Sequence, residues 1–229
     1  MTTTALIVGA GSGLSASLAR LFAAEGITVA LAARQIDKLS ALSQEIGAVS
    51  FACDASKPDR VNQLFSDVEQ KLGTPTVVIY NPSLRIAAPF IELDPIEVAK
   101  SLEITAYGGF LVAQAAAKRM LALGGGAIFF TGASASVKGY PRSAPFAMGK
   151  FALRGLAQSI ARELAPQNIH VAHFIIDGSI RSDSRQEPDD KPDSLLDPDA
   201  IAQTYLNILR QPRNAWTWEV ELRPWVERF

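Results

Sequence analysis

Three glycines near the amino terminus have the spacing of a phosphate-binding turn. They lie in the run Gly9-Ala10-Gly11-Ser12-Gly13-Leu14, directly after the apolar residues Ala5–Val8. A bound phosphate needs bare backbone for close approach and the free N–H groups of a helix amino terminus. Between a first strand and a first helix, this run predicts a dinucleotide site, with an ordinary tight turn as the alternative. The predicted cofactor-binding residues of the turn are Gly9, Gly11, Ser12, Gly13 and Leu14.

An arginine after the second apolar run indicates which dinucleotide binds. The run Thr28–Ala32 continues into Ala33 and Arg34 without an acidic residue. An acid at this place would bond the ribose 2′-hydroxyl of NAD and repel the 2′-phosphate of NADP. The planar guanidinium of arginine instead pairs with a phosphate. Arg34 therefore favours NADP(H) over NAD(H), and a solvated arginine that begins a helix is the alternative.

Short apolar segments alternate with helical patterns along most of the chain. The segments predicted as strands are Ala5–Val8, Thr28–Ala32, Val49–Ala52, Val77–Tyr80, Ala127–Thr131, Ile169–Ile176 and, at the end, Thr217–Leu222. The predicted helices are Leu14–Glu25, Ile36–Ile46, Arg60–Leu72, Pro95–Leu123 (one helix, or two broken near Gly108-Gly109), Pro145–Leu164 and Ala200–Leu209. This alternation predicts the α/β class: a doubly wound parallel sheet with helices on both faces, in a single domain over residues 1–229.

One segment interrupts the alternation. Residues 182–198 are rich in Asp, Ser and Pro and contain few apolar residues. The segment is too long for an ordinary connection, so we expect a mobile loop or lid there. Its acidity is more typical of a solvated surface than of an acidic binding site.

Composition excludes several classes of partner. Lys plus Arg number 22 and Asp plus Glu number 23, which leaves a formal net charge of -1 and no basic field for nucleic acid or an anionic membrane. No apolar run approaches the roughly 18 residues of a membrane span. Cys53 stands alone, so no intrachain disulfide forms, and we expect a reducing, cytoplasmic setting. With only His170 and His173 beside that cysteine, no zinc spacing exists, and no metal site is expected.

Further segments resemble the short-chain dehydrogenase/reductase family in its single-domain Rossmann form. Cys53-Asp54 resembles the family's aspartate that contacts adenine, and Tyr80-Asn81-Pro82-Ser83 stands where Asn-Asn-Ala-Gly is typical. Ile169-His170-Val171 and the run 177–182 resemble the strand and turn beside the nicotinamide, with Asp177 in place of a proline. The resemblance extends from Ala5 to about Ser182. It adds Asp54, Asn81, Gly178 and Ile180 to the expected cofactor-binding residues.

The active-site pair of that family, Tyr-x-x-x-Lys, is represented by Phe146 and Lys150. In the family the tyrosine exchanges a proton with the substrate oxygen during hydride transfer. The lysine binds the nicotinamide ribose and lowers the tyrosine pKa. A spacing of four residues puts both side chains on one helix face, so the resemblance implies that Lys150 keeps its ribose role. Phe146, which replaces the tyrosine, has no proton to give.

Two more family positions are replaced. The partner serine falls at Ala133, with Ser134 close by, and the helix asparagine falls at Thr105. Loss of a positioned general acid costs about a hundredfold to ten-thousandfold in rate, which slows the chemistry without abolishing it. Ser134 and Tyr140 lie in the loop expected to overhang the nicotinamide, and they are candidate substitutes, as is an ordered water. For Tyr140 the alternative is an aromatic ring packed beside Pro141.

Two functions follow from these residues. The first is an NADP(H)-dependent oxidoreductase acting on a small carbonyl or alcohol, with Lys150 holding the ribose and a non-standard proton donor. The second is a non-catalytic NADP(H)-binding protein that uses the fold for sensing or assembly. The missing tyrosine favours the second function, whereas the glycine turn, Lys150 and the expected lid favour the first.

The carboxyl-terminal segment is unusually aromatic. Trp216, Trp218 and Trp225 lie in or beside the last predicted strand, at an edge of the sheet. Exposed sheet edges are normally covered, and tryptophan is enriched at protein interfaces. We therefore expect a homodimer or homotetramer, and a wall of the substrate pocket is the rival interpretation.

Overall fold

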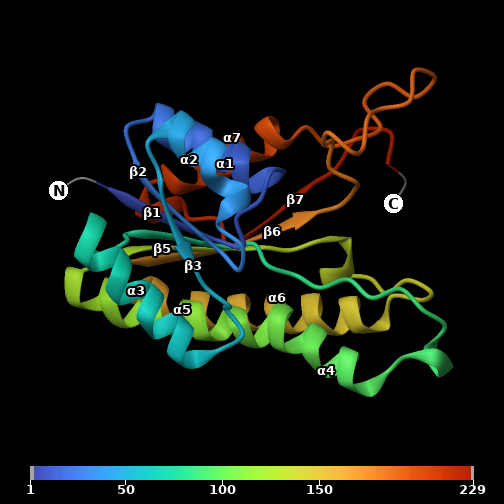
Figure 1. Cartoon of the computed structure of the whole chain (residues 1–229), viewed down its shortest axis with the longest axis horizontal. Helices are drawn as coiled ribbons and strands as arrows, with labels where there is room; N and C mark the ends of the chain where they lie inside the picture. The colour runs from blue at the N-terminus through green and yellow to red at the C-terminus, as the bar shows by residue number, and fades with distance from the viewer. Residues whose placement is uncertain (1–2, 228–229) are drawn as a thin grey trace.

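Seven parallel strands form one sheet in the computed structural model, which describes residues 3–227 (Figure 1). Their bounds are β1 Thr4–Val8, β2 Thr28–Ala33, β3 Val49–Ala52, β4 Val77–Tyr80, β5 Gly126–Thr131, β6 Ile169–Ile176 and β7 Glu219–Leu222. The order is β3-β2-β1-β4-β5-β6-β7, and every neighbouring pair is parallel. The predicted doubly wound sheet is confirmed.

Helices cover both faces of this sheet (Figure 1). One face carries α1 Leu14–Ala24, α2 Ser40–Ile46 and α7 Pro198–Leu209, and the other carries α3 Pro58–Leu72, α4 Pro95–Leu102, α5 Gly108–Leu123 and α6 Ala144–Leu164. Short 3-10 turns occupy Asp37–Leu39, Phe90–Glu92, Ser134–Ser136, Ala165–Gln167 and Arg213–Ala215. The first of these turns replaces the start of the helix predicted at Ile36.

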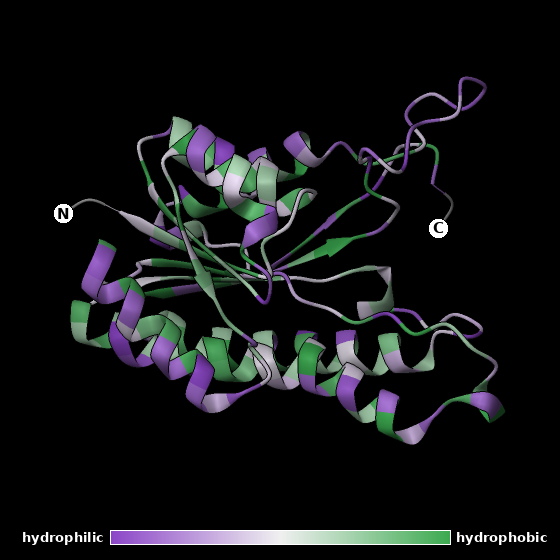
Figure 2. Ribbon diagram, in the orientation of Figure 1, coloured by the Kyte–Doolittle hydropathy of each residue, from purple (hydrophilic) through white to green (hydrophobic). Residues whose placement is uncertain are grey.

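The apolar strands hold two cores, one on each face. Along β1, Leu6 and Val8 pack toward α3, α5 and α6, whereas Ala5 and Ile7 pack toward α1 and α7. Figure 2 shows hydrophobic residues along the strands and polar residues concentrated in the segment after β6. Because successive side chains of a strand point to opposite faces, a strand buried on both faces is apolar throughout.

The long helical region over residues 95–123 is continuous, as in the first of its two predicted alternatives. Instead of a break at the glycine pair, α4 and α5 are joined by a π-helical turn over Glu103–Tyr107. Gly108 and Gly109 are helical residues, and the packing around them leaves no room for a Cβ. A Cβ at Gly108 would lie 2.4 Å from Tyr80 Oη, and one at Gly109 would lie 2.5 Å from Leu153 Cδ1. The glycines thus allow close packing on β4 and α6, and the Tyr80 hydroxyl donates to the Ile104 carbonyl of the π turn.

Part of the aromatic terminus packs within the chain. Trp216 stacks on His170 with ring centroids 4.6 Å apart, and Trp218 packs against the core beside Arg154. Trp225 is 80% exposed. Internal packing therefore accounts for two of these tryptophans.

The segment after β6 projects from the body beyond the carboxyl end of that strand (Figure 1). Apart from isolated bridges between Ile180 and Leu196 and between Ser182 and Arg185, it contains no regular structure before α7. Its mobility stays a prediction. Within residues 3–227, no helix combines the length and apolar character needed to cross a membrane.

Candidate functional site

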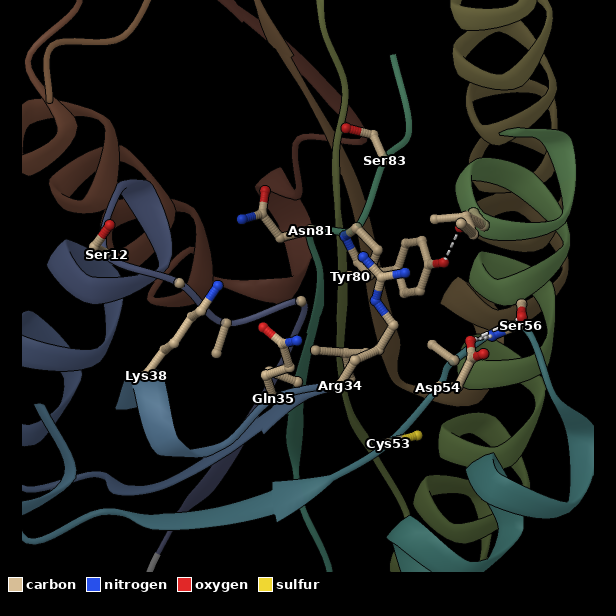
Figure 3. A pocket seen from close by; sticks show the side chains of 18 residues that line it. Ser12, Arg34, Gln35, Lys38, Cys53, Asp54, Ser56, Tyr80, Asn81 and Ser83 are labelled. Carbon is tan, nitrogen blue, oxygen red and sulfur yellow. Dashed lines mark hydrogen bonds between the residues drawn. The ribbon is translucent and has the colours of Figure 1, made fainter. Parts of the chain in front are cut away.

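A cleft of about 700 Å³ opens at the carboxyl ends of β1, β2 and β4 (Figure 3). The chain leaves β1 toward α1 on one face and leaves β4 toward α4 on the other. Adjacent strands whose connections diverge in this way create the crevice in which open α/β sheets bind ligands. Six of the predicted cofactor residues line it: Gly9, Gly11, Ser12, Arg34, Asp54 and Asn81.

The glycine turn is fixed by close contact with the loop after β4. Gly9 has φ +82°, and a Cβ there would lie 2.7 Å from the Pro82 ring. A side chain would be both strained and blocked at this position. Asn81 Nδ2 donates to Ser15 Oγ at 2.7 Å, and Ser15 Oγ donates to the Gly9 carbonyl at 3.2 Å. These bonds join the turn, α1 and β4 into one unit.

Open space above the turn fits a phosphate group. A Cβ built at Gly11 or Gly13 meets no described atom within 4 Å. α1 begins at Leu14 with no acid in its first turn, so its positive end is left for an anion. Gly13 and Leu14 do not line the cleft themselves; they form the cap and the first residue of this helix.

The β2 side of the cleft is cationic. Figure 3 shows Arg34, Gln35 and Lys38 on this side, facing Tyr80, Asn81 and Ser83 on the β4 side. Neither Arg34 nor Lys38 forms a salt bridge with any residue from 3 to 227. Arg34 and Lys38 are therefore two exposed cations that can pair with an anionic group of a ligand in the cleft.

Asp54 and Cys53 end the neighbouring strand. Partial burial acts to raise the pKa of Asp54, but hydrogen bonds from the Ser56 hydroxyl at 2.8 Å and amide at 3.1 Å hold it below its ordinary value. Asp54 therefore stays ionised. Burial raises the pKa of the Cys53 thiol to about 11, so it remains a protonated, unreactive side chain at neutral pH.

Lys150 is a buried cation without a described carboxylate partner. It is 3% exposed, and its Nζ donates to the Thr131 carbonyl at 2.7 Å. Among residues 3–227, no acid lies within salt-bridge distance of it. Burial lowers its pKa to about 8. Its Nζ lies 5.8 Å from the centroid of the Phe146 ring, so the spacing of four places both residues together as predicted.

A buried hydrogen-bond chain supports the turn that follows β5. The Ala133 amide donates to Ser136 Oγ at 3.1 Å, and Ser136 Oγ lies 3.4 Å from His173 Nε2. His173 Nδ1 lies 3.0 Å from Glu219, which also accepts two bonds from Arg154, at 2.6 and 2.7 Å. Burial lowers the pKa of His173 to about 4, so the ring is neutral and donates from Nδ1. The histidine is a hydrogen-bonded group of the core.

The remaining predicted residues lie outside the cleft lining. Ser134 begins the 3-10 turn and is partly buried, whereas Tyr140 is 45% exposed. Gly178 packs against Pro224, since a Cβ there would lie 2.9 Å from its ring, and Ile180 pairs with Leu196. Their catalytic or cofactor roles stay predictions.

Sequence reasoning missed several residues of the site. Gln35, Ser56, Pro82, Ser83 and Ile104 line the cleft, as does Lys38. Lys38 carries a usable signal, because it lies only four residues after Arg34 in the sequence. The sequence around Arg85 does not indicate that it belongs to the site. Its guanidinium carbon lies 5.8 Å from the Phe146 ring centroid because the folded loop between β4 and α4 brings it there.

Comparison with known proteins agrees with this geometry. Residues 3–193 match the family described as short chain dehydrogenase. Carbonyl reductase family member 4 of Xenopus tropicalis is 25% identical over 222 residues, which span 93% of each chain. A crystal structure of a short-chain dehydrogenase from Rhodopseudomonas palustris is 38% identical, with a TM-score of 0.83 over 97% of this chain and 99% of the other. A metagenomic short-chain oxidoreductase solved in complex with NADP is 27% identical, with a TM-score of 0.85 over 97% of each chain.

The burial of Lys150 predicts a stabilising substitution. Its folded pKa of about 8 lies below the ordinary 10.5, so between these values the unfolded chain binds more protons and wild-type stability rises with pH. Lys150→Met removes this penalty but also a hydrogen bond. At pH 7 it should raise the free energy of unfolding by about 1–3 kcal/mol, and the gain should shrink by pH 9.5.

Urea denaturation without cofactor, at both pH values, measures this difference. Lys118→Met, on α5 outside the cleft, is the matched control and should change little at either pH. Equal destabilisation by Lys150→Met at both pH values would show that the ammonium is not strained by burial.

Proposed function

The chain belongs to the short chain dehydrogenase family, and on that premise we propose that it is an NADP(H)-dependent oxidoreductase acting on a small carbonyl or alcohol. The observation that carries the choice of NADP(H) is the pair Arg34 and Lys38, two cations of the cleft without a described salt bridge. The NADP in the similar metagenomic oxidoreductase supports the same choice.

The chain's own residues account for cofactor binding. Gly9, Gly11 and Ser12 present backbone and the start of α1 to the phosphates, while Arg34 and Lys38 pair with the 2′-phosphate. By family resemblance, Asp54 contacts the adenine, and Lys150 holds the nicotinamide ribose. When bound, the cofactor supplies or accepts the hydride. The protein's part is to orient the reactants and to place charge and a proton beside the carbonyl oxygen.

We assign to Lys150 the role of proton donor to the substrate oxygen. A general acid works best when its pKa is close to the working pH, and burial brings the pKa of Lys150 to about 8. Its Nζ lies 5.8 Å from the centroid of the Phe146 ring, and Phe146 occupies the position of the family's tyrosine. The ammonium stabilises negative charge that develops on the substrate oxygen and donates a proton during reduction. Ser134 and Tyr140 are the alternative donors.

A non-catalytic role is the second candidate. The observation that favours it is Phe146 itself, which cannot exchange a proton. In that case the cleft binds NADP(H) for sensing or assembly, and binding occurs without turnover of any carbonyl.

The assignment of Arg34 predicts selective loss of affinity. Arg34→Ala should weaken NADPH binding about 10- to 100-fold, the value of a charge-assisted pair, and should change NADH binding far less. Lys38→Ala should act in the same direction. Calorimetric titration of each variant with both cofactors measures this, with Lys118→Ala as the control. Equal losses for NADPH and NADH would contradict the assignment to the 2′-phosphate.

Because Phe146 replaces the family's proton-donating tyrosine, restoring a tyrosine there is predicted to increase the carbonyl-reductase activity. Phe146→Tyr with Ala133→Ser restores the family's hydroxyls and should raise kcat/KM for NADPH-dependent carbonyl reduction, by less than the roughly hundredfold value of a general acid because Lys150 already donates a proton. Phe151→Tyr, on the same helix and 45% exposed, is the matched control and should give no gain. No gain across a broad carbonyl panel, with NADPH affinity intact, would mean that the pocket does not accept a carbonyl in this place.

A further inference from the structure

Two cations face the same ring in the expected substrate site. Arg85 lies in the loop between β4 and α4, just after Asn81, Pro82 and Ser83 of the cleft. Its guanidinium carbon and Lys150 Nζ each lie 5.8 Å from the Phe146 ring centroid. Both distances are within the range of a cation–π contact. Arg85 therefore stands beside the place where the substrate carbonyl is expected.

The backbone that carries Arg85 is held on both sides. The Leu84 amide donates to Thr105 Oγ1 at 3.2 Å, and the Leu84 carbonyl accepts from Ser101 Oγ at 2.7 Å. Thr105 and Ser101 are both fully buried. Three residues after Arg85, the Ala88 amide donates to the Arg142 carbonyl at 3.2 Å. The loop thus presents its arginine from a fixed base.

The positive charge at this point is not balanced by the described part of the protein. Neither Arg85 nor Lys150 has a carboxylate within salt-bridge distance among residues 3–227. The buried Asp177, in the turn after β6, is already paired with Lys138 at 3.0 Å. Arg85 is exposed and solvated by water, whereas Lys150 is buried, and an anion that binds between them is attracted by both charges. We therefore expect the substrate bound beside Arg85 and Lys150 to carry a negatively charged group.

We propose that Arg85 binds a substrate carboxylate and that the substrate is a short oxo acid or the corresponding hydroxy acid, an inference that rests on the proposed function. The planar guanidinium donates two parallel hydrogen bonds to a carboxylate. Arg85 Cζ and Lys150 Nζ each lie 5.8 Å from the Phe146 ring centroid, so a short substrate can place its carboxylate at Arg85 and its carbonyl near Lys150. The substrate class is therefore the 2-oxo or 3-oxo acids of short chain length.

The reaction balances with the groups named. The carbonyl carbon accepts the hydride of NADPH, its C=O π bond breaks, and the oxygen takes one proton from Lys150. The oxo acid is reduced to a hydroxy acid and NADPH is oxidised to NADP⁺. Lys150 regains its proton from solvent, and the carboxylate on Arg85 is unchanged throughout.

Paired substrates test the inference. Reduction of 2-oxobutanoate and 3-oxobutanoate is compared with that of their methyl esters at saturating NADPH, which separates carboxylate recognition from carbonyl reduction. Wild type should prefer at least one acid over its ester. Arg85→Leu should lower that acid-to-ester ratio of kcat/KM about 10- to 100-fold, and Arg85→Lys should lower it less. Lys100→Met, an exposed cation of α4 paired with Glu97, should leave the ratio unchanged.

A binding measurement tests carboxylate recognition by Arg85 independently of the proposed oxidoreductase activity. Oxamate carries a carboxylate but no reducible ketone, so its titration into wild type and Arg85→Leu, with and without NADPH, requires no turnover. Binding to wild type that is at least tenfold weaker in Arg85→Leu supports the inference. Equal affinities, no binding to wild type, or an acid-to-ester ratio unaffected by Arg85→Leu would overturn it. Failure of NADPH to bind would count against the proposed function alone, since the cofactor-free titration still decides the role of Arg85.

Discussion

The position of β1 between β2 and β4 is the constraint on which the site depends. β1 pairs in parallel with both neighbours, and the chain leaves β1 and β4 toward opposite faces. The strand ends therefore open a crevice that no crossover helix covers. Gly9 can enter this crevice only as glycine, because its backbone has φ +82° and lies against Pro82. The cofactor cleft is a consequence of strand order and of one close backbone contact.

Charge placement is the second organising feature. Most acids and bases near the site are already paired, as Glu219 is with Arg154 and His173, and Asp177 with Lys138. Arg34 and Lys38 at one end, and Arg85 and Lys150 at the other, have no described carboxylate partner. Lys150 is buried at a cost in free energy, whereas Arg34, Lys38 and Arg85 are exposed and solvated, and all four are favourable beside an anionic ligand. The proposed function and the proposed substrate class both follow from this distribution.

The sequence was informative where local pattern determines structure. Apolar strands and the glycine run predicted the parallel sheet and the turn, because burial on both faces and close backbone approach each restrict residue types. The spacing of Phe146 and Lys150 placed them together. Tertiary packing determined the rest. The π turn at Glu103–Tyr107, the use of Gly108 for contact with Tyr80, and the approach of Arg85 to Phe146 depend on elements distant in sequence.

The central claim is that Lys150 acts as the acid that the tyrosine supplies elsewhere in the family. The most direct test is the pH dependence of kcat/KM for NADPH-dependent carbonyl reduction, in wild type and in Ser134→Ala and Tyr140→Phe. Since the protonated ammonium is the active form for reduction, all three proteins should lose activity about tenfold per pH unit above a pKa near 8. A profile that stays flat to pH 10, or a descending limb that either hydroxyl variant abolishes, would contradict the assignment of the proton to Lys150.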